Sequence, residues 1–174
     1  MKRSTMIFAA AALWLTAAAA LAQEPAALQP LDFLLGEWRN LDAAQPGAGT
    51  GSALFARSLQ DRIITRTSYA EFPAAADKPG SRHDDLMIIY AGRDGVKADY
   101  YDNEGHVIRY AVHTPAAGEV VFLSAAQPGE PVFRLTYKLA SPEILKGEFA
   151  VAAPDAPADF KLYLVWETRK VAAK

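Results

Sequence analysis

The chain has 174 residues, a formal net charge of −2 and no cysteine. Without cysteine it can form no disulfide, and no thiolate is available as a nucleophile or metal ligand. The slightly acidic balance, with no run of basic residues, argues against a nucleic-acid partner, because binding to phosphates needs clustered Lys and Arg side chains.

Residues 1–22 have the pattern of a secretory signal peptide. A Lys-Arg pair at positions 2 and 3 precedes the apolar segment 6–21, and an Ala-Leu-Ala sequence provides a small-residue cleavage site before Gln23. The segment is short for a membrane span and no stop-transfer pattern follows it. We therefore expect a periplasmic or secreted protein with one mature domain, 23–174, and no stable membrane span after signal removal. Loss of the two basic residues takes the formal charge from −2 to −4.

The spacing of Pro and Gly in the mature chain is typical of a β-sheet protein. A short helical turn is expected near 28–35, and after it Pro and Gly fall between runs of β-branched and aromatic residues. The pattern predicts an all-β fold, a closed or nearly closed antiparallel up-and-down barrel of about eight to ten strands. The expected strands are 36–40, 50–58, 61–72, 84–91, 96–102, 105–114, 118–124, 132–139, 143–152 and 160–170.

Turn chemistry joins several of these strands directly. Asp102-Asn103-Glu104-Gly105 supplies side-chain acceptors and a glycine able to adopt positive φ, and Arg93-Asp94-Gly95 does the same one strand earlier. Leu59-Gln60-Asp61-Arg62 is a weaker turn. Consecutive hairpins imply that neighbouring strands are antiparallel.

Period-two alternation indicates which side chains face the interior. The inward sets are expected to be Phe133, Leu135, Tyr137 and Leu139 on 132–139, and Leu145, Gly147, Phe149 and Val151 on 143–152. On the last strand, Phe160, Leu162, Leu164 and Trp166 are expected to share one side. The parity of 62–72 and 105–114 is ambiguous. On the latter strand the apolar count favours Ile108, Tyr110 and Val112 over Val107, Arg109 and Ala111.

The Gly36-Glu37-Trp38 entry, about ten strands and the closing Trp166-Glu167-Thr168-Arg169 resemble the calycin superfamily. More closely, the chain resembles secreted bacterial lipocalin-like or nitrobindin-like barrels of unknown function. The resemblance implies that Trp38 packs under a basic residue of the last strand, here Arg169, to close the barrel. Nitrobindin-like proteins hold haem through a late His. Since His113 is the last His of this chain, we expect no haem and no other cofactor.

No catalytic motif stands out. No serine lies in a Gly-x-Ser-x-Gly nucleophile elbow, and Asp84 and Asp85, as neighbours on a strand, point to opposite faces. His83 beside them is explained by a solvated loop, so we expect no metal site. Binding is favoured over catalysis.

The cavity chemistry predicts a small apolar or amphipathic ligand inside the barrel. The candidate ligand-binding residues are Tyr69, Tyr90, Tyr100, Tyr110, Tyr137 and Arg109. Arg109 is favoured over Arg66 and Arg134 as a guanidinium that holds an anionic end. Two alternatives stay open: an enzyme, such as a hydrolase or isomerase, that uses the same pocket, and a cell-envelope interaction protein whose barrel is filled by its own side chains. The sequence leaves the oligomeric state undetermined.

Overall fold

The computed structural model describes residues 26–41, 49–74 and 78–172. The predicted signal peptide, 1–22, lies outside these residues. The described chain consists of one short 3-10 helix, η1 (Gln29–Leu34), and ten strands. The strands are β1 (Gly36–Asn40), β2 (Thr50–Ser58), β3 (Ile63–Phe72), β4 (Ser81–Gly92), β5 (Gly95–Asp102), β6 (Val107–Ala116), β7 (Glu119–Ser124), β8 (Val132–Ser141), β9 (Ile144–Ala152) and β10 (Phe160–Lys170).

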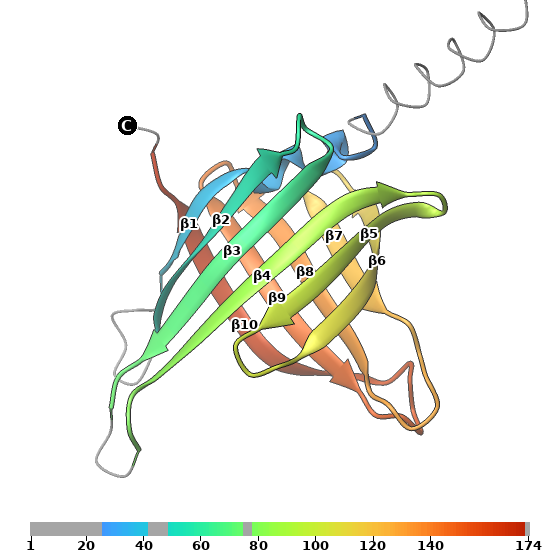
Figure 1. Cartoon of the computed structure of the whole chain (residues 1–174). Helices are drawn as coiled ribbons and strands as arrows, with labels where there is room; N and C mark the ends of the chain where they lie inside the picture. The colour runs from blue at the N-terminus through green and yellow to red at the C-terminus, as the bar shows by residue number, and fades with distance from the viewer. Residues whose placement is uncertain (1–25, 42–48, 75–77, 173–174) are drawn as a thin grey trace, which may run out of the picture.

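The strands form a closed antiparallel barrel in which each strand pairs with its neighbours in sequence and β1 pairs with β10 (Figure 1). This confirms the predicted all-β, up-and-down architecture. η1 lies at one end of the barrel, and the paired ends of β3 and β4 extend beyond the other strands at the opposite end, which we call the far end. The even-numbered strands begin at the far end.

Local sequence explains most strand boundaries. Gly95 and Gly105 have φ values of 106° and 92°, in the left-handed region that the hairpin turns require and that glycine adopts without steric penalty. β3 begins at Ile63 rather than 61 because Leu59, Gln60 and Asp61 all have positive φ, so the turn from β2 extends through them. The predicted hairpins therefore join the expected strands, but the strand boundaries differ from the prediction by a few residues.

The core is built at the η1 end. Leu31 and Leu34 of η1 are buried together with Trp38 at the start of the barrel, and the Trp38 indole Nε1 donates to the Leu34 carbonyl at 2.7 Å. A cation covers the indole, as expected, but it is Lys170, whose Nζ lies 5.1 Å from the ring centroid. The strand register explains why the cation is Lys170 and not the predicted Arg169. Trp38 is paired with Lys170, whereas Arg169 is paired with Arg39 on the exposed face.

The structure resolves the ambiguous strand faces. Tyr110 is buried, and Ile108 and Val112 pack against the core, so this set faces inward as predicted. On β3 the inward row is Ile64 and Arg66, both buried.

β10 differs from the prediction because its register shifts between Leu162 and Leu164. Leu162 is paired with Ala150, whereas Leu164 and Trp166 are paired with Phe149 and Gly147. The irregularity adds one residue and exchanges the faces. Leu164 and Trp166 therefore share the inward row, while Phe160 and Leu162 lie on the other face.

Candidate functional site

The barrel interior changes from apolar to polar along β3. Toward η1, Ile64 is packed among Trp38 and Phe55, and all three side chains are almost completely inaccessible. Two residues further along the same inward row is Arg66, which is 5% exposed. A guanidinium at this depth needs partners, because burying an unpaired charge is strongly unfavourable. The residues that surround Arg66 therefore define the candidate site.

Arg66 is paired inside the barrel. Its Nη2 forms an ion pair with Asp85 of β4, and both side chains are 6% exposed. Its Nη1 donates to the Tyr137 hydroxyl of β8 at 2.5 Å. Burial lowers the pKa of Arg66, but the Tyr137 phenol and the Asp85 carboxylate outweigh burial, so the pKa lies above its ordinary value. Within the described residues the buried Nε has no hydrogen-bond partner. The site thus combines a neutralised guanidinium with one unused donor.

Asp85 is fully engaged. One carboxylate oxygen accepts from Arg66, and the other accepts from the Ser68 hydroxyl at 2.6 Å. Ser68 and Arg66 follow one another on the inward row of β3, and Asp85 precedes Met87 on the inward row of β4. The barrel wall therefore presents these polar groups to the interior in a fixed arrangement.

A second hydrogen-bonded group lies beside this cluster at the rim of the far end, where His83 Nε2 is 3.8 Å from Asp85 Oδ2. The Tyr100 hydroxyl lies 3.1 Å from His83 Nε2 and 3.2 Å from Asp102 Oδ2, while His83 Nδ1 lies 3.0 Å from Glu104 Oε1. Asp102 also faces His106 Nδ1 at 2.8 Å. Since Tyr100 has one hydroxyl proton and two acceptors, it donates to His83 when Nε2 carries no proton and to Asp102 when Nε2 is protonated.

Burial raises the pKa of the Tyr100 phenol at the rim, whereas hydrogen bonds lower the pKa of the Asp102 carboxyl. Burial, reinforced by Asp85 and Asp102, raises the pKa of Tyr100 above its ordinary range, so it stays a neutral phenol. Burial also acts to raise the pKa of Asp102, but hydrogen bonds from His106, Tyr100 and the Glu104 backbone outweigh it and lower that pKa. Asp102 is therefore an ionised, fully hydrogen-bonded carboxylate.

The opposite wall of the far end is apolar. Phe133 of β8 and Phe149 of β9 stack with ring centroids 5.9 Å apart, and both pack against the core together with Ile108. Leu164 shares the inward row of Phe149, yet it is 53% exposed. Solvent therefore reaches the inner face of the barrel at this wall, opposite the polar cluster.

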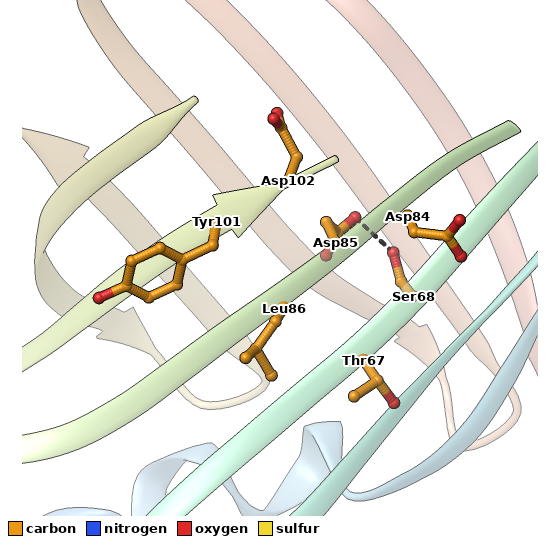
Figure 2. Close-up of a pocket in the computed structure, with 7 residues that line it drawn as sticks. All are labelled: Thr67, Ser68, Asp84, Asp85, Leu86, Tyr101 and Asp102. Atoms are coloured by element: carbon orange, nitrogen blue, oxygen red, sulfur yellow. Dashed lines mark hydrogen bonds between the residues drawn. The ribbon is translucent and has the colours of Figure 1, made fainter. Parts of the chain in front are cut away.

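A depression of about 350 Å³ lies where β3, β4 and β5 run side by side, and Figure 2 shows the residues that line it. Its lining consists of Asp84 and of two neighbouring rows of side chains, each running from β3 through β4 to β5. Ser68, Asp85 and Asp102 form the row that carries the interior cluster; the outward row is Thr67, Leu86 and Tyr101. The Ser68–Asp85 hydrogen bond is visible within it. Within 26–41, 49–74 and 78–172, no group of three or more His, Asp or Glu residues is arranged to hold a metal ion.

The predicted ligand-binding tyrosines divide between the two faces. Tyr100, Tyr110 and Tyr137 lie on inward rows, and the Tyr137 ring makes edge contacts with three neighbouring aromatic rings. Tyr69 lies outward, 4.4 Å beneath the Arg82 guanidinium, and the outward Tyr90 hydroxyl bonds Asp99 at 3.4 Å. The structure brings only the first three toward the candidate site.

Of the three candidate arginines, Arg66 enters the interior, and Arg109 and Arg134 do not. Arg109 is exposed because Tyr110, its neighbour on β6, takes the inward position, and Arg134 lies over the Phe160 ring at 4.3 Å. The sequence held a usable signal, since Arg66 follows Ile64 and Asp85 precedes Met87 at period two, which places both polar residues on apolar rows. The register of the two strands, which brings Asp85 within reach of Arg66, is what only the structure supplies.

None of the protein-family models matches this chain, and no curated protein is significantly similar to it. Among the described residues, no helix is both long and apolar enough to cross a membrane.

Proposed function

We propose that this protein binds a small amphipathic molecule in the far-end interior of the barrel, with the polar end at Arg66 and the apolar part along Phe149 and Leu164. The observation that carries the proposal is the contrast between two walls of the far-end interior: the buried Arg66–Asp85 ion pair lies on one, and the stacked Phe133 and Phe149 rings with the half-exposed Leu164 lie on the other. Fixed polar groups opposite an apolar wall are the arrangement that orients an amphipathic molecule.

The distribution of polarity supports an amphipathic ligand. Polar side chains face the interior from β3, β4 and β5, whereas the stacked rings of Phe133 and Phe149 and the half-exposed Leu164 face it from β8, β9 and β10. Ligand sites commonly combine apolar walls with a few polar groups that fix orientation. A barrel of this strand number also has an interior wide enough for one small molecule.

We further propose that the chain is a member of the calycin superfamily. The closed antiparallel barrel of ten strands is consistent with a calycin-like fold. The Gly36-x-Trp38 entry with a cation over the indole supports this relationship, although the cation is Lys170.

A fluorescent probe and two neighbouring variants test the binding proposal. N-phenyl-1-naphthylamine is neutral and amphipathic, and we expect its fluorescence to rise on saturable binding to the purified protein. Leu164→Glu places a charge on the inward apolar wall and should weaken probe binding at least about tenfold, because a carboxylate would be desolvated there. Val165→Glu is the matched control, because Val165 is 60% exposed and outward.

The outcomes separate the interior site from its rivals. Loss of binding in Leu164→Glu with retention in Val165→Glu supports the interior site. Equal effects of both variants would assign the probe to the outer surface of β10. Absence of saturable binding to the unaltered protein would refute the proposal and favour a barrel that acts through its surface. Native mass spectrometry of protein purified without refolding would identify any natural ligand retained.

We also propose export to the periplasm or the medium, on the evidence of residues 1–22 alone. Mass spectrometry of the protein from its native cells should give a mature N-terminus at Gln23. Recovery of the uncleaved chain would refute this prediction.

A further inference from the structure

We infer that the apolar wall of the far-end interior selects a ligand whose apolar part is a flat aromatic ring system, over one whose apolar part is saturated hydrocarbon. This inference rests on the proposed function and specifies the ligand class of the same site. It depends on three aromatic side chains from neighbouring strands, which we call the aromatic wall: Phe133 of β8, Phe149 of β9 and Tyr163 of β10.

The first step concerns how the three rings are arranged. Phe133 and Phe149 are stacked, with their planes 10° apart and their centroids 5.9 Å apart. The Tyr163 ring stands nearly perpendicular to Phe149, at 80° and a centroid distance of 6.3 Å. Stacked and edge-to-face pairs are the two arrangements that the quadrupole of an aromatic ring favours. A further ring can therefore extend the aromatic wall by the same kinds of contact.

The second step concerns access to these rings. Phe133 and Phe149 pack against the core but are only partly buried. Tyr163 is 72% exposed, so its ring is not covered on both faces, and the adjacent Leu164 on the inward row is 53% exposed. A ligand that enters the barrel at the far end therefore meets accessible aromatic surface before it reaches the buried core.

The third step concerns why Tyr163 lies beside Phe149. The register of β10 shifts between Leu162 and Leu164, so Tyr163 is the added residue. Regular alternation would place the residue before the inward Leu164 on the outer face, yet the Tyr163 ring contacts the inward Phe149. Irregularities of this kind often lie beside functional sites, where they redirect a side chain. Here the redirected side chain adds a third ring to the aromatic wall.

The fourth step compares the two kinds of ligand. Both gain from burial in proportion to the apolar area that leaves water. An aromatic ring also gains from stacked and edge-to-face contacts with the three rings, which saturated groups cannot make. An alkyl chain, in addition, loses rotational freedom on binding, whereas a fused ring system has none to lose. The aromatic wall therefore favours planar rings over saturated groups of the same carbon skeleton.

Two alcohols with the same head group and the same skeleton test the inference. Naphthalene-2-ethanol and its fully hydrogenated analogue, decahydronaphthalene-2-ethanol, are each titrated against bound N-phenyl-1-naphthylamine. Burial of area alone would favour the hydrogenated compound, which has the larger apolar surface. We expect naphthalene-2-ethanol to displace the probe at a concentration at least about threefold lower. Equal displacement, or stronger displacement by the hydrogenated compound, would overturn the inference.

Leucine variants test the rings themselves. Tyr163→Leu removes the exposed ring, and Phe149→Leu removes the ring that both other members contact, so each should lower the preference for the naphthyl compound at least about twofold. Phe160→Leu is the matched control, because Phe160 is an aromatic residue of the same strand that lies on the other face, 4.3 Å from the Arg134 guanidinium. It should leave the preference unchanged.

The variants and the two proposals fail in distinguishable ways. An unaltered preference in Tyr163→Leu, or an equal loss in Phe160→Leu, would overturn the inference. Since Tyr163 is largely exposed, this variant decides the question even if Phe149→Leu does not fold. If the probe does not bind the unaltered protein, the proposed function fails and the aromatic preference fails with it. If the probe binds but the hydrogenated alcohol displaces it as well as the naphthyl alcohol does, only the inference fails.

Discussion

Gly147 offers the sharpest test of the packing beneath the candidate site. It is paired with Trp166 across β9 and β10, and a Cβ built on it would lie 2.1 Å from Trp166 Cε2. Carbon atoms in ordinary contact are about 3.5–4.0 Å apart, so Gly147→Ala requires a shift of roughly 1.5 Å. The indole cannot yield freely, because its edge-on neighbour Tyr137 lies 5.9 Å away between centroids and is itself bonded to Arg66.

Two opposing effects set the expected loss of stability in Gly147→Ala. Overpacking of a fixed core typically destabilises by about 1–3 kcal/mol, while replacing a strand glycine by alanine recovers roughly 0.5–1 kcal/mol of backbone entropy. Gly147→Ala should therefore lower the free energy of unfolding by about 1–2 kcal/mol. Urea titration followed by far-ultraviolet circular dichroism should show a midpoint lowered by roughly 0.5–1 M.

Two companion variants decide whether the indole is the cause. Glu148→Ala, at the next and exposed position, should change stability by no more than about 0.5 kcal/mol. In a Trp166→Phe background the clashing indole atoms are gone, so Gly147→Ala should cost less than it does beside tryptophan. An unchanged cost in that background, or a neutral Gly147→Ala single variant, would refute the packing argument.

Three further predictions concern the charged groups. Arg66→Met should destabilise by about 3–5 kcal/mol in urea unfolding because it leaves Asp85 buried without its cation, and adding Asp85→Leu should recover most of the loss; additive effects would contradict this. Asp102 has a lowered pKa in the folded state, so its contribution is present above pH 4 or so and is lost as pH falls through the folded value; acid titration should therefore weaken the unaltered protein more than Asp102→Asn. Lys170→Met should cost about 0.5–1 kcal/mol by loss of the cation over the indole, whereas Arg169→Met, on the exposed face, should be neutral, and equal effects would refute the assignment.

The architecture could be predicted from local patterns because strands and hairpins are local. The Asp-Asn-Glu-Gly turn at 102–105 favours a hairpin through its own side-chain acceptors and the positive φ of Gly105, and alternation over 107–112 places Tyr110 inward once a core exists to receive it. Where a pattern is broken by a single inserted residue, the same reasoning fails. The register shift near Leu162 leaves no compositional mark, so the faces of β10 could not be assigned in advance.

The site was less predictable because its energetics depend on pairs. Arg66 and Arg109 are equivalent as isolated residues on strands of mixed polarity. Only Arg66 has within hydrogen-bond reach both Asp85, on the next strand β4, and Tyr137, 71 residues away on β8. A buried guanidinium is stable only when charged and hydrogen-bonding partners surround it. Its position therefore depends on contacts that a short segment of sequence does not contain.

The sequence by itself determined the β-rich composition, the order of hairpins and the absence of cysteine chemistry, because turn residues and period-two alternation act over a few residues. Tertiary structure decided which cation covers Trp38, which arginine enters the interior and what charge remains there. Those outcomes follow from register and mutual neutralisation across the barrel, where a shift of one residue exchanges inside for outside.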